Sequence, residues 1–330
     1  MHDRTRPDTS RSIAHRSRRS VLRGLGGGTF AALGLGGLGR AATRGATASP
    51  LLWQRDVVYG EIAGQPLLLD IASPPPRGTP RPAVILIHPG GLVAGDRSFM
   101  ADHVPPLAGA GYVAVNIAYR LFSEQDGTNP WPAQLDDAQR AVRWVRANAG
   151  TLGVDPTRIG AFGHSSGALL AAHLGTRETR DDPGADVGAD LGDHSSRVTC
   201  VVDVAGKMDL TLASQDAAMT PRTVALLGGT VDSPPEHAVL GDFSPVTWVD
   251  GETVPFLILH GTGDTLCPIA QSRRMVTALQ EAGREIVAAE FPTLNHYTIL
   301  DWAVIGPETL AFLGRHLHPE ESWGVGVTVR

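Results

Sequence analysis

The sequence predicts an α/β fold with a mostly parallel central sheet flanked by helices. Short apolar runs with the length of buried strands alternate along the chain with stretches that have helical periodicity. Clusters of Gly, Pro, Asn and Asp, which favour turns, separate these segments. Strands that alternate with helices indicate βαβ units, in which functional residues gather at the carboxyl ends of the strands.

The expected elements follow one another from residue 57 onward. A hairpin is expected over 57–62 and 66–71, and further strands over 83–88, 112–119, 158–162, 198–204, 254–260 and 285–291. Helices are expected over 132–148, 166–174, 268–282 and 306–316, where the residues follow a helical pattern. The polar segment 177–196 is expected to form a surface loop.

A long segment separates the sixth and seventh expected strands. Its leucine and methionine residues are interrupted by Pro221, Pro234 and Pro235. Proline ends or kinks helices, so we expect short helices and turns here. The sequence therefore predicts a small cap insertion over about 206–250, with no long amphipathic lid.

Charge is distributed unevenly along the chain. The formal net charge is −6, but residues 1–48 hold nine arginines against Asp3 and Asp8, so the remainder carries −13. An acidic body argues against nucleic acid or an anionic membrane as a partner.

No C-x-x-C or H-E-x-x-H pattern occurs, so we expect neither a metal nor a cofactor. Cys200 and Cys267 are too few for a disulfide framework, and a bridge between them stays open.

The first 48 residues have the organisation of an export signal. Arg18 and Arg19 precede a Gly-rich, mildly apolar stretch over 24–39 that is too short for a stable membrane anchor. The small-residue pattern ATA follows at 46–48. We expect a twin-arginine signal peptide over 1–48 and a mature domain over 49–330, located in the periplasm or outside the cell. The alternative interpretation is a disordered basic tail.

The pentapeptide Gly163-His164-Ser165-Ser166-Gly167 lies between an expected strand and an expected helix. Gly163 and Gly167 flank Ser165 two residues on either side, as in the G-x-S-x-G pattern of a nucleophile elbow. Small flanking residues avoid clashes at such a sharp, strained turn. Ser165 is the predicted nucleophile, and the backbone N–H of Ser166 is a predicted oxyanion donor. The alternative is an ordinary Gly-rich turn.

A serine nucleophile needs a base to remove its proton and a third group to orient that base. After such an elbow, the expected order along the chain is Ser, then Asp or Glu, then His. Asp264 follows the seventh expected strand and His296 follows the eighth, which makes them the predicted acid and base. Asp209 is the alternative acid, because the rule fixes only the order. His260 ends a strand before Asp264, and we expect it to be structural.

The stretch HPGG at 88–91 follows the third expected strand, where esterases carry an oxyanion loop. An oxyanion is stabilised by backbone N–H groups aimed at the developing charge. Pro89 has no N–H, so Gly90 and Gly91 are the predicted donors beside Ser166.

Several ordered stretches resemble an α/β-hydrolase carboxylesterase of the hormone-sensitive-lipase and feruloyl-esterase-like group. They are HPGG at 88–91, NIAYRL at 116–121, WPAQLDDAQRAVRWVRANAGTLGVDPTRIGAFGHSSG at 131–167, SPVTWV at 244–249, LHGTGD at 259–264 and NH at 295–296. The resemblance covers most of residues 57–316 and implies an α/β-hydrolase catalytic domain with Ser165 as nucleophile, Asp264 as acid and His296 as base. The family usually has Gly where Pro89 stands.

The predicted function is that of an exported serine esterase. It would hydrolyse short-chain or small aromatic carboxylic esters through an acyl-enzyme intermediate, with a small-molecule ester as its partner. Leu92, Val93 and Trp131 lie near the motifs and are the predicted lining of the substrate pocket. Two alternatives stay open: an amidase, arylformamidase or small peptidase with the same triad, and a hydrolase fold that binds ligands without catalysis. The oligomeric state also stays open.

Overall fold

The computed structural model describes residues 50–178, 191–211, 220–230 and 232–318. The chain divides into two units, Met1–Ala46 and Thr47–Arg330, and every described residue lies in the second. The expected signal peptide over 1–48 and most of the expected loop over 177–196 therefore lie outside the described residues.

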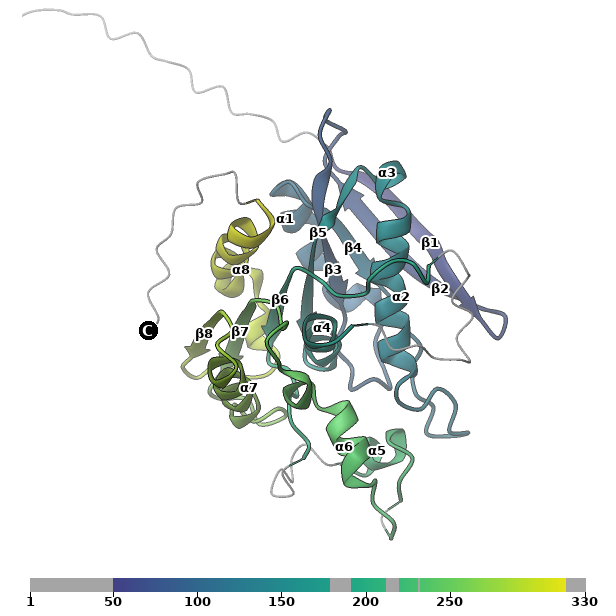
Figure 1. Ribbon diagram of the computed structural model, residues 1–330, viewed down its shortest axis with the longest axis vertical. Coiled ribbons are helices and arrows are strands. Elements are labelled where there is room, and N and C mark those ends of the chain that lie inside the picture. The colour runs from purple at the N-terminus through teal and green to yellow at the C-terminus, as the bar shows by residue number, and fades with distance from the viewer. Residues whose placement is uncertain (1–49, 179–190, 212–219, 231, 319–330) are drawn as a thin grey trace, which may run out of the picture. The chain divides into compact units, whose positions relative to one another are not determined.

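The described residues of the second unit form one eight-stranded sheet (Figure 1). Its order is β1-β2-β4-β3-β5-β6-β7-β8. The strands are β1 (Leu52–Ile62), β2 (Gln65–Ser73), β3 (Arg81–Ile87), β4 (Val113–Ile117), β5 (Val154–His164), β6 (Cys200–Val204), β7 (Phe256–Gly261) and β8 (Ile286–Phe291). The β1–β2 hairpin and the β2–β4 pair are antiparallel, and all other pairs are parallel. The mostly parallel sheet flanked by helices confirms the predicted fold class.

Helices cover both faces of this sheet. The α-helices that pack on it are α1 (Val104–Gly109), α2 (Ala133–Ala147), α4 (Ser166–Thr176), α7 (Ala270–Glu281) and α8 (Trp302–Leu317), with the short α3 (Ala149–Leu152) after α2. Apolar residues of α2, α4 and α7 share one buried cluster, and those of α1 and α8 share another. The helices expected from the sequence over 132–148, 166–174, 268–282 and 306–316 correspond to α2, α4, α7 and α8.

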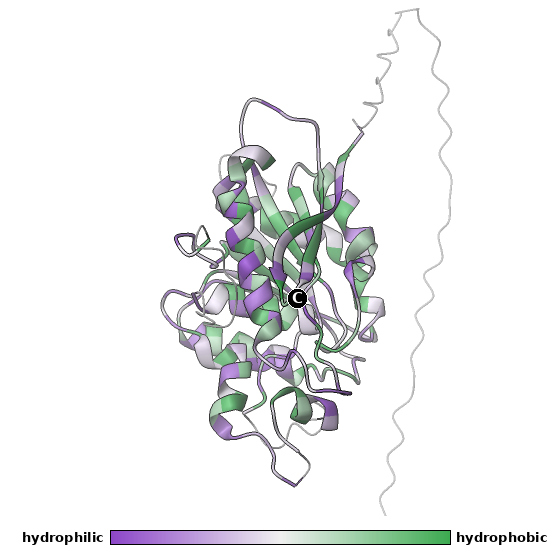
Figure 2. Cartoon of the chain, turned by 90° about the vertical axis from the view of Figure 1, so that its right-hand side faces the viewer, coloured by the Kyte–Doolittle hydropathy of each residue, from purple (hydrophilic) through white to green (hydrophobic). Residues whose placement is uncertain are grey.

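The core follows from the apolar runs of the central strands. Successive side chains of a strand point to opposite faces, so a run that is apolar at every position buries both faces. In β3, Ile85 and Ile87 pack in the cluster of α2, α4 and α7, whereas Val84 and Leu86 pack in the cluster of α1 and α8. Figure 2 shows the helices with hydrophobic and hydrophilic stripes around these largely hydrophobic strands.

The described residues between β6 and β7 form only short elements. These are α5 (Pro221–Leu226), α6 (His237–Phe243) and the 3-10 helix η2 (Pro245–Trp248). They match the short helices expected for the cap over about 206–250, of which residues 212–219 and 231 lie outside the described part. Within the described ranges, no helix has both the length and the apolar character that a membrane crossing requires. Cys200 and Cys267 are both buried and free, so they form no bridge.

The parallel strands bring the predicted motifs to one edge of the sheet. The HPGG stretch follows β3, Ser165 follows β5, Asp264 follows β7 and His296 follows β8. The carboxyl ends of parallel strands lie at the same edge, where α/β sheets bind ligands. Two further 3-10 helices, η1 (Arg97–His103) and η3 (Thr298–Leu300), flank these loops.

We expect Gly167→Ala to destabilise the fold strongly, because α4 touches the backbone of β3 at this residue. A Cβ at position 167 would lie 2.1 Å from the carbonyl oxygen of Ile87, which cannot move aside without displacing the strand. Overpacking of this kind costs about 1–3 kcal/mol or more. The free energy of unfolding, measured in urea, tests this.

Gly109→Ala is the matched control, since a Cβ there would meet nothing within 4 Å. Its free energy of unfolding should stay close to that of the wild type. Equal stability of the two variants would contradict the inferred close packing of α4 on β3.

Candidate active site

The chain turns sharply from β5 into α4 at Ser165. Its backbone has φ 56° and ψ −121°, a positive-φ conformation that costs a non-glycine residue free energy. The Ser165 N–H donates to the carbonyl oxygen of Val204 at 2.9 Å, which ties the turn to β6. A Cβ at Gly163 would lie 2.2 Å from the carbonyl oxygen of Gly167, so the two glycines that flank the serine permit the turn.

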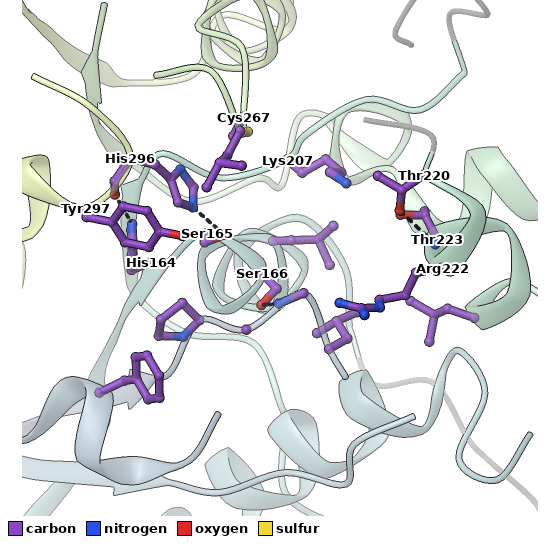
Figure 3. A pocket seen from close by; sticks show the side chains of 18 of the residues that line it. His164, Ser165, Ser166, Lys207, Thr220, Arg222, Thr223, Cys267, His296 and Tyr297 are labelled. Carbon is purple, nitrogen blue, oxygen red and sulfur yellow. Dashed lines mark hydrogen bonds between the residues drawn. The ribbon is translucent and has the colours of Figure 1, made fainter. Parts of the chain in front are cut away.

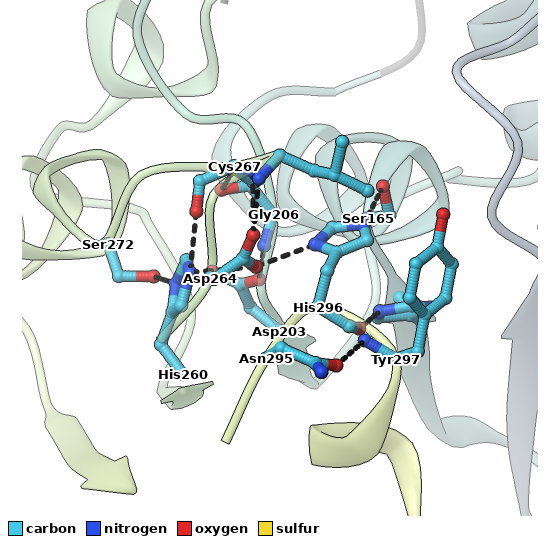
Figure 4. Close-up of polar contacts among 12 residues, drawn as sticks. Ser165, Asp203, Gly206, His260, Asp264, Cys267, Ser272, Asn295, His296 and Tyr297 are labelled. Carbon is cyan, nitrogen blue, oxygen red and sulfur yellow. Dashed lines mark hydrogen bonds and ion pairs between the residues drawn. The ribbon is translucent and has the colours of Figure 1, made fainter. Parts of the chain in front are cut away.

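A chain of short hydrogen bonds joins Ser165, His296 and Asp264 (Figure 4). His296 Nδ1 lies 2.6 Å from Asp264 Oδ2, and His296 Nε2 lies 2.9 Å from Ser165 Oγ. A carboxylate accepts hydrogen bonds, so Nδ1 carries the proton and Nε2 is the acceptor for the serine hydroxyl. This arrangement can draw a proton from Ser165 as its oxygen attacks an electrophilic carbon.

Asp264 is held as a buried carboxylate. Its Oδ1 accepts the backbone N–H groups of Leu266 at 2.9 Å and Cys267 at 2.8 Å. Burial alone would raise the pKa of this carboxyl, but hydrogen bonds from His260, His296 and the Cys267 N–H outweigh burial and lower the pKa well below its usual value. Asp264 therefore stays charged opposite His296.

His260 touches the same carboxylate from the other side. Its Nε2 lies 3.3 Å from Asp264 Oδ2 and 2.9 Å from the Cys267 carbonyl oxygen, and its Nδ1 lies 2.6 Å from Ser272 Oγ. Both neighbours of Nε2 are acceptors, so Nε2 carries a proton and Ser272 donates to Nδ1. Sequence reasoning assigned His260 a structural role and missed its contact with Asp264. The i,i+4 spacing of these residues was the available signal.

Asp203, at the end of β6, is a second buried carboxyl near this network. Its Oδ1 accepts the Gly206 N–H at 2.9 Å, and burial raises its pKa to about 6. The alternative acid, Asp209, lies elsewhere: its Oδ2 pairs with Arg274 Nη2 at 2.7 Å, and Oδ1 accepts from Thr211. The carboxylate bonded to His296 Nδ1 is that of Asp264 and not that of Asp209.

Several hydrogen bonds hold the loop after β3 in place. Tyr119 Oη donates to the His88 carbonyl oxygen at 2.9 Å, and the two rings stack with their centroids 4.1 Å apart. The Gly90 carbonyl oxygen accepts the N–H groups of Val93 and Ala94. The Gly91 N–H donates to Ser166 Oγ at 2.9 Å.

These contacts change the expected set of oxyanion donors. Three donors were expected at Gly90, Gly91 and Ser166, but the Gly91 N–H is already used by the Ser166 hydroxyl. No local pattern predicts this contact, because it joins residues 75 positions apart. Ser166 is the first residue of α4, where a helix offers its N–H no intrahelical acceptor. The N–H groups of Gly90 and Ser166 remain as candidates.

A pocket of about 460 Å³ opens over Ser165 (Figure 3). Apolar side chains of Leu92, Leu169, Leu226 and Phe243 line part of it. The other lining residues are Pro89, Gly90, Gly91, Phe99, His164, Ser166, Lys207, Thr220, Arg222, Thr223, Leu266, Cys267, His296, Tyr297 and Leu300. Figure 3 shows His296 and Tyr297 on one side of Ser165, and Lys207, Thr220 and Arg222 on the other side.

Two of the three residues predicted to line the pocket do not reach it. Leu92 lines it, but Val93 and Trp131 do not. The indole Nε1 of Trp131 donates to Asp242 Oδ2 at 2.7 Å, and its ring packs edge-on against Phe243. Trp131 therefore lies behind the pocket wall, which proximity in the sequence could not reveal.

Comparison with known proteins identifies the family. The model of the BD-FAE family matches residues 69–279, more than half of the chain. The chain belongs to the BD-FAE family. The expected resemblance to α/β-hydrolase carboxylesterases like hormone-sensitive lipase is thereby confirmed.

Two esterases of Mycobacterium tuberculosis strain H37Rv are similar to this family member. Esterase LipQ is 33% identical over 73% of this chain and 56% of its own length, and Esterase LipC is 31% identical over 77% and 62%. The chain thus spans between half and two thirds of the length of these relatives.

Solved structures of esterases share the fold. A truncated carbohydrate esterase from gut microbiota has a TM-score of 0.69 at 26% identity, covering 83% of this chain and 99% of that one. The thermophilic esterase Est2 of Thermogutta terrifontis has a TM-score of 0.65 at 23% identity, covering 84% and 94%. At that identity, the second likeness supports the fold alone.

His164 should make the stability of this protein depend on pH. Burial, and then the nearby His296, lower its pKa to about 3. The unfolded chain binds a proton here below about pH 6.5, whereas the native state does not until about pH 3. The contribution of His164 to the free energy of unfolding is therefore fully present above pH 6.5 and is lost as the pH falls. The loss is at most about 1.4 kcal/mol per pH unit.

The test compares the wild type with His164→Gln between pH 7.5 and 4.5. As the pH falls, the free energy of unfolding, measured in urea, should decrease less steeply in the variant. The difference between the two slopes should correspond to about one bound proton. Comparing slopes removes any constant loss of stability that the substitution causes. Identical slopes would show that His164 takes up its proton over the same pH range in the native and the unfolded protein.

Proposed function

We propose that this BD-FAE family member is a serine carboxylesterase that acts through an acyl-enzyme intermediate. The observation that carries the proposal is the unbroken hydrogen-bond chain from Ser165 through His296 to Asp264, located at an open pocket. The similar proteins LipQ and LipC are named esterases, which favours ester hydrolysis over the amidase and peptidase alternatives. A complete triad also argues against a non-catalytic binding protein.

In this mechanism, Ser165 Oγ attacks the ester carbonyl carbon while His296 Nε2 takes the hydroxyl proton. Asp264 stabilises the imidazolium that forms and keeps its ring in place. The bond from the carbonyl carbon to the alcohol oxygen breaks, and His296 returns the proton to that oxygen. Water then attacks the acyl-enzyme by the same route and releases the acid.

The negative charge on the carbonyl oxygen needs donors that are fixed in advance. We propose the N–H groups of Ser166 and Gly90 for this role. The hydroxyl of Ser166 holds the Gly91 N–H, and Tyr119 holds the His88 carbonyl, so the loop is rigid before a substrate binds. A rigid donor set costs no reorganisation during the reaction.

We expect Ser165→Ala to lower kcat by roughly 10⁴- to 10⁶-fold and His296→Ala to be similarly impaired. Asp264→Asn should lower kcat by about 10⁴-fold, because the substitution leaves His296 in the wrong tautomer. Steady-state hydrolysis of 4-nitrophenyl acetate, with circular dichroism to verify folding, measures these losses.

Two variants are the controls for these roles. Ser166→Ala keeps its backbone N–H and should lose far less activity than Ser165→Ala. Asp209→Asn should retain near-wild-type kcat but lose stability, because it weakens the ion pair with Arg274. A larger loss of kcat in Asp209→Asn than in Asp264→Asn would reassign the acid.

We propose that the preferred esters have short or small aromatic acyl groups. Buried side chains of Leu169, Leu226 and Phe243 close the part of the pocket where an acyl chain fits. The described part of the cap has only short helices and forms no long lid that could open over a lipid. Each methylene that the pocket buries adds about 0.8 kcal/mol, until the space is filled.

A series of 4-nitrophenyl esters from acetyl to dodecanoyl tests the acyl preference. The value of kcat/KM should be greatest between acetyl and butyryl and fall for longer chains, because they no longer bind in a productive orientation. A maximum at twelve carbons would contradict the small acyl site.

We also propose that the twin-arginine segment directs export of the folded enzyme. Replacement of Arg18 and Arg19 by lysine should leave active precursor in the cytoplasm, because a receptor reads the arginine pair. Immunoblots of cell fractions measure this. Mature enzyme outside the cytoplasm of the double variant would refute the export route.

A further inference from the structure

Three exposed apolar side chains surround one side of the pocket mouth. Phe99, Leu266 and Tyr297 are exposed by 55%, 52% and 71%, and all three line the pocket. Scattered single apolar residues are normal on a protein surface, but a gathered set at a pocket is typical of a binding site. We call Phe99, Leu266 and Tyr297 the apolar rim.

The apolar rim lies on the side of His296. Tyr297 follows His296 directly, and the two rings are 5.7 Å apart in an edge-on arrangement. The N–H of Leu266 donates to Asp264 at 2.9 Å. Phe99 belongs to η1, and η1 is tied to η3 by the contact of 2.8 Å between His103 Nε2 and the Leu300 carbonyl oxygen.

The chemistry of acyl transfer decides which part of an ester this side receives. His296 Nε2 must deliver the proton from Ser165 to the oxygen of the departing alcohol, so that oxygen lies next to His296. The carbonyl oxygen lies at the Ser166 and Gly90 donors, and the acyl chain extends away from His296. The polar side chains of Lys207, Thr220 and Arg222 lie across Ser165 from His296 (Figure 3).

We infer that the apolar rim is the binding subsite for the alcohol part of the ester, and that it selects alcohols with an apolar ring. Two of its three side chains are aromatic, and aromatic rings favour edge-to-face or offset contacts with other rings. The inference rests on the proposed esterase function. It goes further by assigning the alcohol end of the substrate, which the triad itself does not select.

Benzyl acetate and ethyl acetate are the probes, because they share an acyl group and differ in the alcohol. The wild type should have the higher kcat/KM for benzyl acetate. Tyr297→Ala and Phe99→Ala should each lower kcat/KM for benzyl acetate about three- to tenfold more than for ethyl acetate, the worth of one aromatic contact. Trp53→Ala is the matched control, since it removes an exposed aromatic side chain from β1, outside the pocket lining.

The hydrolysis of the acetyl-enzyme provides a second measurement, which a general structural defect would change. Both esters give the same acetyl-enzyme after the alcohol has left. Its rate of hydrolysis, measured in single turnover with 4-nitrophenyl acetate, should therefore be the same in the wild type and in both rim variants. A slower deacylation would mean that the substitutions disturb the triad, and it would overturn the inference.

Other outcomes separate this inference from the proposed function. If the rim variants lost the same factor in kcat/KM for both acetates, the alcohol subsite would be overturned and the esterase function would stand. The same would follow if their loss of kcat/KM for ethyl esters depended on the length of the acyl chain. Failure of the wild type to cleave any of these esters, together with no labelling of Ser165 by a fluorophosphonate, would refute the esterase function and the subsite with it.

Discussion

The close approach of α4 to the carboxyl ends of β3 and β5 is the constraint on which the site depends. Gly163 and Gly167 have no Cβ, and a Cβ at either position would lie about 2 Å from a backbone oxygen. The chain can then turn from strand to helix within one residue and hold Ser165 at positive φ. The same approach brings the first residue of α4 against the loop after β3, where Ser166 accepts the Gly91 N–H.

Around this turn, the site is built from buried polar groups that partner one another. An ionised carboxylate is costly to bury unless donors surround it. Asp264 receives two backbone N–H groups and lies between His296 and His260, so its charge is both stabilised and directed at the base. The second histidine extends the network to Ser272 on α7. The fixed positions of the acid and base thus depend on the packing of α7 as well as on the loops that carry them.

The pocket is asymmetric about Ser165. Buried aliphatic and aromatic side chains enclose one part of it, and exposed ones surround the side of His296. An ester carbonyl held between the serine and the oxyanion donors must direct its two substituents to different ends. The proposed acyl and alcohol sites are thus formed by separate elements, by α4 and the cap on one side and by η1 and the loops after β7 and β8 on the other.

The sequence by itself determined the eight strands, the four longer helices α2, α4, α7 and α8, and the positions of Ser165, Asp264 and His296 on loops after strands, but it gave no signal for α1. Local sequence patterns encode these features, namely apolar runs, turn residues and the spacing of glycines. Only the tertiary structure decided that Trp131 lies behind the pocket wall and that Gly91 gives its N–H to a side chain. Such contacts join residues far apart in the chain, and the loops that make them have no periodic pattern. Their positions follow from the packing of the helices on the sheet, which local signals do not encode.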